Sequence, residues 1–179
     1  MASKAVASFR SACLAMGCLL AFAVGAAELS TPAARGQAVS LLLPGKAALT
    51  LDASALAAMP HISIRAASHD EPSSDWRGVP LREILLRAGA PLDKPLRGKA
   101  LAHFVRVTAT DHYQVVFGMA DLDPSLGNTQ VILADQRDGK PLAEDGPFRL
   151  VVGGDQRPAR WVRNVAGIEI VDGSTTDKP

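Results

Sequence analysis

The stretch 146–171 constrains the fold of this chain more than any other segment. It opens with a Gly-Pro breaker, and residues 148–152 form a short apolar run rich in β-branched side chains, which is typical of a buried strand. Gly153 and Gly154 then predict a turn, because glycine adopts positive φ angles without steric cost. A second β-type run closes the stretch at 165–171. Two buried strands are therefore expected to hold an irregular loop between them, and such loops often carry binding residues.

The loop between these two strands is strongly basic. Residues 157–163 contain three arginines, a proline and a tryptophan, and a fourth arginine lies on the first strand. Guanidinium groups bind phosphate or carboxylate through paired hydrogen bonds, so the loop is predicted to bind an anion. A solvated rim, with its arginines paired to nearby acids, is the alternative. The residues that we expect to bind a ligand here are Arg149, Arg157, Arg160, Trp161 and Arg163.

The first 27 residues have the pattern of a secretory signal peptide. Lys4 and Arg10 precede an uncharged apolar run at 12–24, and small residues precede Glu28. We therefore expect a bacterial protein that is periplasmic or secreted through the general secretory route, with a mature chain that begins near Glu28. The apolar run is short for a membrane span, which needs about 20 residues. An uncleaved membrane anchor and a lipoprotein anchor at Cys18 are the alternatives.

Cysteine usage and charge exclude several classes of function. Both cysteines, Cys13 and Cys18, lie in the predicted signal, so a mature chain has no thiol for a disulfide, a zinc–cysteine site or a nucleophile. The four histidines lack the short spacing of a zinc site, and no metal site is expected. Two of the 19 basic residues belong to the signal, which leaves 17 basic against 18 acidic residues. A nearly neutral domain is not typical of nucleic-acid-binding proteins.

The remaining sequence predicts one domain of the α+β class that is mainly β. A flexible leader is expected at 28–37, the domain at 38–171 and a disordered tail at 172–179. Helices are predicted at 52–58, with Asp52 as N-cap, and at 81–88. Residues 69–75 are expected to form an exposed turn, and Asp138-Gly139 to form a hairpin turn. Strands are predicted at 38–43, 48–51, 61–68, 104–109, 113–117, 131–134, 148–152 and 165–171.

Four segments, in the same order, resemble the sulfite oxidase-type molybdopterin-binding domain. The first is Trp-Arg-Gly-Val-Pro-Leu at 76–81, before a helix that ends in Ala-Gly. The second is Asp-His-Tyr at 111–113, which is similar to an Asp-Gly-Tyr turn of that family. The third, 131–142, resembles its strand, glycine turn and Pro-Leu, and the fourth is the stretch 146–171. This resemblance implies a sulfite oxidase-like pterin-binding fold in minimal form, and an unrelated sandwich with similar turns is the alternative.

The resemblance also identifies where this chain departs from the family. A family cysteine before the Trp-x-Gly segment ligates molybdenum, and the corresponding stretch here is Ala-Ala-Ser-His at 66–69, without a thiolate. Ser68 and His69 offer an oxygen and a nitrogen there, or belong to a surface loop. Exported family enzymes usually carry a twin-arginine signal, whereas Arg10 stands alone. The resemblance places Arg160-Trp161 beside the pterin phosphate, and it adds Asp111 and Tyr113 to the ligand-binding candidates.

These observations favour an exported, non-catalytic binding module of the molybdopterin-binding oxidoreductase family. Its expected ligand is an anionic small molecule or a partner protein, and neither a catalytic residue nor a resident cofactor is expected. One alternative is a pterin-dependent oxidoreductase subunit that keeps molybdopterin without the cysteine ligand. Another is a structural partner of a membrane sensor or redox complex. The mature chain is not expected to span a membrane itself.

Overall fold

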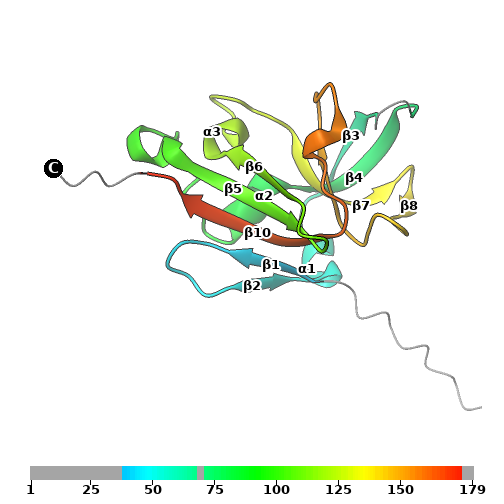
Figure 1. Cartoon of the computed structure of the whole chain (residues 1–179), viewed down its shortest axis with the longest axis horizontal. Helices are drawn as coiled ribbons and strands as arrows, with labels where there is room; N and C mark the ends of the chain where they lie inside the picture. The colour runs from blue at the N-terminus through cyan, green and yellow to red at the C-terminus, as the bar shows by residue number, and fades with distance from the viewer. Residues whose placement is uncertain (1–37, 68–70, 175–179) are drawn as a thin grey trace, which may run out of the picture. The chain divides into compact units, whose positions relative to one another are not determined.

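The computed structural model describes residues 38–67 and 71–174. The expected signal peptide, the leader and residues 175–179 of the expected tail lie outside these ranges. The described residues form two β-sheets with short helices (Figure 1), so the expected α+β, mainly β class is confirmed. None of their helices is long and apolar enough to cross a membrane. The elements in chain order are β1 (Val39–Leu42), β2 (Leu49–Leu51), α1 (Ala53–Ala57), β3 (Ile62–Ala66), β4 (Ser74–Pro80), α2 (Leu81–Arg87), the 3₁₀ turn η1 (Gly98–Ala102), β5 (His103–Ala109), β6 (Gln114–Gly118), α3 (Met119–Leu122), β7 (Val131–Arg137), β8 (Lys140–Pro141), β9 (Arg149–Val152), the 3₁₀ turn η2 (Pro158–Arg160) and β10 (Val165–Asp172).

The first sheet has the strand order β2-β1-β10-β5-β6. β1 runs parallel to β10, and the other neighbours in this sheet are antiparallel. In β5 the residues Val105, Val107 and Ala109 are buried, and the residues between them are partly exposed. This alternation is the period-two pattern of a sheet with one face on the core.

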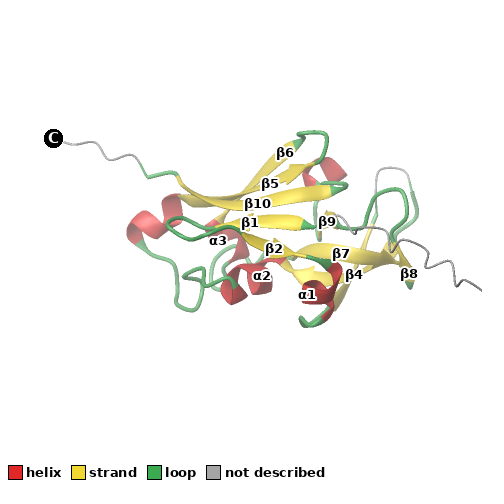
Figure 2. Cartoon of the chain, turned by 90° about the horizontal axis from the view of Figure 1, so that it is seen from below, coloured by secondary structure: helices red, strands yellow, loops and turns green. Residues whose placement is uncertain are grey.

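The second sheet has the order β3-β4-β7-β8, and β9 also pairs with β7. All four residues of β9 and the first four of β7 are buried, so these strands are covered on both faces. Figure 2 shows β6, β5, β10 and β1 in one layer and β7 and β4 in another, with α1 and α2 on the side of β4 and β7.

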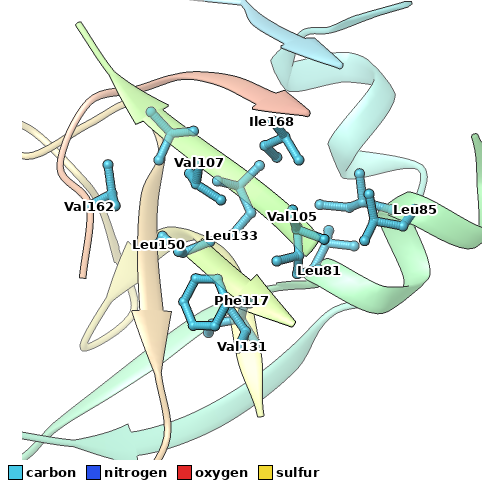
Figure 3. Close-up of a cluster of buried hydrophobic side chains, with 14 of the residues drawn as sticks. Leu81, Leu85, Val105, Val107, Phe117, Val131, Leu133, Leu150, Val162 and Ile168 are labelled. Atoms are coloured by element: carbon cyan, nitrogen blue, oxygen red, sulfur yellow. The ribbon is translucent and has the colours of Figure 1, made fainter. Parts of the chain in front are cut away.

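The hydrophobic core lies where the two sheets face each other. Figure 3 shows Val105 and Phe117 of the first sheet converging with Leu133 and Leu150 of the second, and α2 adds Leu81 and Leu85. Trp76 and Leu85 are completely buried.

Local signals in the sequence predicted two of the connections correctly. The Asp52 side chain accepts a hydrogen bond from the backbone N–H of Ala55 at 2.8 Å, which is the expected N-cap of α1. Asp138 and Gly139 have φ angles of 50° and 75° and join β7 to β8, as a hairpin turn of this type requires.

The expected exposed turn at 69–75 was wrong at its C-terminal end, because Ser74 and Asp75 already belong to β4. β4 contains a register shift between Arg77 and Gly78 where it pairs with β7. A Cβ at position 78 would lie only 2.3 Å from the carbonyl oxygen of Leu133. Glycine therefore permits a close approach between strands here, although in sequence it indicates a break. The structure also extends β10 to Asp172, which the sequence assigned to the tail.

Candidate functional site

Arg149 is the first residue of β9, and its guanidinium lies against two tryptophan rings. The guanidinium carbon is 5.0 Å from the ring centroid of Trp76 and 5.3 Å from that of Trp161, and the two rings form a T-shaped pair at 5.5 Å. These distances are those of cation–π contacts. Trp76 donates its indole N–H to the carbonyl of Ala66, and Trp161 donates to that of Val152. Both tryptophans are thus fixed in the core as the walls around Arg149.

The charge of Arg149 is balanced by Asp145. Arg149 Nη1 donates to Asp145 Oδ2, and Arg163 Nε lies 3.2 Å from Asp145 Oδ1. Arg149 Nε is buried and has no hydrogen-bond partner among the described residues. Burial lowers the pKa of Arg149, and Asp145 opposes that effect, while the positive charges of Arg163 and Arg137 lower the pKa further. A further negative charge beside Arg149 would therefore stabilise the buried cation.

A pocket of about 230 Å³ adjoins this cluster. Val165 of β10 pairs with Ala109 of β5, and this pairing brings the turn after β5 next to the loop that precedes β10. Five of the nine ligand-binding residues predicted from the sequence line the pocket. Its lining consists of Ala109, Asp111, Tyr113, Arg149, Pro158, Ala159, Trp161 and Arg163.

Tyr113 connects the two segments that form the pocket. Its hydroxyl donates to the carbonyl of Ala159 at 2.5 Å, and its backbone N–H donates to Asp111 Oδ1 at 3.0 Å. His112 between them has a φ angle of 69°, so a tight turn presents both neighbouring side chains to the pocket. The phenol hydroxyl is thus used to hold η2 in place.

Two of the predicted arginines lie outside the lining of this pocket. Arg160 donates to Asp155 from Nε at 3.0 Å and from Nη2 at 2.5 Å, and its guanidinium carbon lies 5.0 Å from the Phe117 ring centroid. The hydrogen bond to Asp155 is the main cause of the raised pKa of Arg160. Arg157 is exposed and forms no ion pair within the part of the chain that the structure describes.

Ser68 and His69, the other two predicted residues, lie outside the described residues. Within 38–67 and 71–174 there is no group of three or more His, Cys, Asp or Glu side chains placed to hold a metal ion.

Sequence reasoning missed the acidic residue that completes the cluster. Asp145 lies just before the stretch 146–171, and it contacts both Arg149 and Arg163. Its spacing of four residues before Arg149 was the one available signal, but that spacing predicts a contact only for residues in a helix, and these two are not in one. Arg137 was also missed, because no neighbouring residue in the sequence indicates that it belongs to this cluster. Its guanidinium carbon lies 5.0 Å from the Trp76 ring centroid.

Comparisons with known proteins identify the family and the fold. The family model described as "Oxidoreductase molybdopterin binding domain" matches residues 63–178. Among solved structures, the sulfane dehydrogenase SoxCD from Paracoccus pantotrophus is similar, with a TM-score of 0.59 and 20% sequence identity. The similarity covers 79% of this chain and 39% of that chain, so this chain spans well under half of that relative. At this identity the likeness shows a common fold. No curated protein matches the sequence.

Proposed function

Because this chain belongs to the oxidoreductase molybdopterin-binding domain family, we propose that it is a binding module of that family and holds a small anion beside Arg149. The observation that carries the proposal is the state of Arg149 itself. Its side chain is only 4% exposed, its Nε has no hydrogen-bond partner among the described residues, and it lines a pocket together with Arg163. A buried cation beside a pocket favours an anionic ligand.

The size and the donors of the pocket suit a tetrahedral anion such as phosphate or sulfate. A volume of about 230 Å³ is smaller than the roughly 300–1,000 Å³ of typical small-molecule pockets. Arg163 has N–H donors beyond the Nε that faces Asp145. A charge-assisted hydrogen bond contributes about 1.5–3 kcal/mol when it is shielded from water.

The residues present do not fit a molybdenum centre held by a thiolate. The sequence contains no cysteine after Cys18. The polar groups that line the pocket beside Asp111 are two guanidinium groups and a phenol, and guanidinium cations do not ligate metal ions. We therefore propose a binding role without a redox step, and no catalytic residue is assigned.

The proposal is tested by titrating phosphate and sulfate into the intact protein by calorimetry. We expect Arg163→Ala to weaken binding about fivefold, because Arg163 lines the pocket although most of its side chain is exposed. Arg157→Ala removes the same charge from the same loop outside the pocket, and we expect it to stay within twofold of wild type. Equal effects of the two substitutions, or none, would show that the arginines form only a solvated rim.

A rival function is that of a pterin-dependent subunit which keeps its cofactor without the cysteine ligand. The family and the basic residue next to Trp161 favour it. Protein purified from its native host would then contain molybdenum or pterin in a ratio near one per chain, and that result would contradict a cofactor-free binding module. Co-purification of a membrane protein in place of a small ligand would instead support a structural partner role.

We further propose that the protein acts in the periplasm or outside the cell. The support is the charged start, the apolar run and the small residues of the first 27 positions. The intact mass of the exported protein should correspond to a chain that begins near Glu28. A full-length mass in the membrane fraction would contradict this proposal.

A further inference from the structure

A second cavity, of about 370 Å³, shares no lining residue with the arginine pocket. It lies between the end of β1, the segment after α2, η1 and the start of α3. Most of its walls are apolar and include the side chains of Leu43, Leu96, Ala100, Met119 and Ile170. Four of these five are buried in the core, whereas Ala100 is only partly buried.

The volume of this cavity is that of a ligand site. Pockets that bind small molecules measure roughly 300–1,000 Å³ and are mostly apolar with a few polar groups. An apolar cavity of about 150 Å³ is known to take a benzene molecule. A volume of 370 Å³ therefore accommodates an apolar group of about twice that size.

Lys46 is the cation at this cavity; it is exposed, and two backbone carbonyls accept hydrogen bonds from its ammonium group. Its ammonium group donates to the carbonyls of Ala88 and Gly89 at 3.0 and 2.9 Å, at the C-terminal end of α2. Gly89 has a φ angle of 82°, and a Cβ there would lie 2.3 Å from Lys46 Nζ, so glycine also leaves room for the ammonium. An ammonium group has three donors. One N–H of Lys46 therefore remains for a ligand.

His103 is the other polar side chain in the lining, and it faces acceptors of the protein. Its Nδ1 is 3.3 Å from the carbonyl oxygen of Ala100, and its Nε2 is 3.4 Å from Asp172 Oδ1. The cavity thus combines an apolar interior with one ammonium group that has a spare donor. A single positive charge is matched by a monoanion.

We propose that this cavity binds a medium-chain carboxylate, with its alkyl tail among Leu96, Met119 and Ile170 and its carboxylate on Lys46. This site is independent of the arginine pocket, with which it shares no lining residue. Its affinity should depend on tail length, because each methylene that leaves water strengthens binding about fourfold.

The test is a calorimetric titration of hexanoate, octanoate and decanoate, each below its micelle concentration, into the intact protein. We expect affinity to rise about fourfold per methylene. Lys46→Met keeps most of the side-chain length, and it should weaken decanoate about three- to fivefold, as expected for an exposed ion pair, while decanol binding stays within twofold. Ala100→Phe fills the cavity and should weaken both ligands at least tenfold. Arg163→Ala, at the other pocket, is the matched control and should change neither.

The position of the ligand is checked by NMR of the methionine methyl groups. Decanoate should shift the methyl signal of Met119 and leave that of Met59, which lies outside the cavity lining, unchanged. This measurement needs no variant and holds even if Ala100→Phe fails to fold. An unshifted Met119 signal at saturating decanoate, or the absence of saturable binding, would overturn the proposal. Binding that Lys46→Met leaves within twofold would overturn the role of the ammonium.

Discussion

Arg149 and Asp145 form an ion pair that is buried at one end only. The side chain of Arg149 is 4% exposed, whereas that of Asp145 is 26% exposed. The carboxylate of Asp145 therefore stays in contact with water, while the guanidinium that it neutralises is almost fully buried. Because Arg149 also lies against Trp76 and Trp161 and lines the arginine pocket, the pair connects the core to that pocket.

Asp145→Ala should destabilise the protein more than the loss of an ordinary surface residue. Removing one partner of a buried ion pair leaves an uncompensated charge, which costs about 3–5 kcal/mol, and the partial exposure of Asp145 places the expected loss near the lower value. Urea unfolding monitored by tryptophan fluorescence measures it. Arg163→Ala breaks only the exposed contact to the same carboxylate and should cost less than about 1 kcal/mol. Similar losses for the two variants would show that Arg149 does not depend on Asp145.

The same ion pair predicts an effect of ligand on the Asp145 variant. An anion in the pocket can replace part of the lost negative charge, so phosphate should raise the urea midpoint of Asp145→Ala more than that of wild type. Unfolding at several phosphate concentrations, at constant ionic strength, measures this difference. Equal shifts for the two proteins would mean that the anion does not bind next to Arg149.

Gly78→Ala should disrupt the pairing of β4 with β7. The added Cβ would lie 2.3 Å from the Leu133 carbonyl oxygen and 2.5 Å from the Cα of Ala134, and both are backbone atoms that cannot turn aside. Overpacking of this kind costs about 1–3 kcal/mol or more. Gly167→Ala is the control, because its Cβ would be 3.8 Å from the nearest atom, the carbonyl oxygen of Ser40. Chemical denaturation should show a large loss for the first variant and little change for the second.

Arg160→Ala should affect the stability of the loop more than anion binding. The guanidinium is held by both oxygens of Asp155 and lies over Phe117, although 39% of the side chain is exposed. We expect a loss of about 1 kcal/mol and phosphate affinity within about threefold of wild type. Hydrogen exchange of the amides in 153–163 should become faster. A tenfold loss of phosphate binding with unchanged exchange would instead place Arg160 in the binding site.

Asp123 should make stability depend on pH in the acid range. Hydrogen bonds from the hydroxyl and the backbone N–H of Ser125, at 2.6 and 2.7 Å, lower the pKa of Asp123, and Leu96 N–H adds a third at 3.2 Å. A folded-state pKa below the unfolded value of about 3.9 gives stability that is present above that value and lost as pH falls through the folded pKa. Asp123→Asn should therefore be less stable than wild type at about pH 7, with the difference shrinking toward about pH 2. Urea midpoints across this range measure the effect, and a difference that does not change with pH would contradict it.

Much of the fold was predictable because its signals are local. The cap at Asp52, the turn at Asp138-Gly139 and the alternation in β5 each depend on a few adjacent residues. β4 was missed because Gly78 and Pro80 normally interrupt strands, and only the distant Leu133 shows why a glycine is needed there. The four-residue helix α3 is too short to show a helical period.

The candidate site was predictable in part. Arginines in a glycine-flanked loop indicated an anion site, and the family resemblance added Asp111 and Tyr113 from another part of the chain. Which arginines line the pocket depends on their acidic partners. Asp155 holds Arg160 within the loop, while Asp145 holds Arg149 and Arg163 beside the pocket. These ion pairs depend on how the chain folds back on itself, which the spacing of residues in the sequence does not reveal.

The parallel pairing of β1 with β10 also determines the order in which the first sheet can be completed. β1 lies between β2 and β10, but more than a hundred residues separate it from β10 along the chain. During synthesis β1 can pair with β2 at once, but its other edge stays unpaired until β10 has been made. The first strand of the described fold is thus among the last to gain both of its neighbours, and until then the backbone groups along one of its edges have no strand partner.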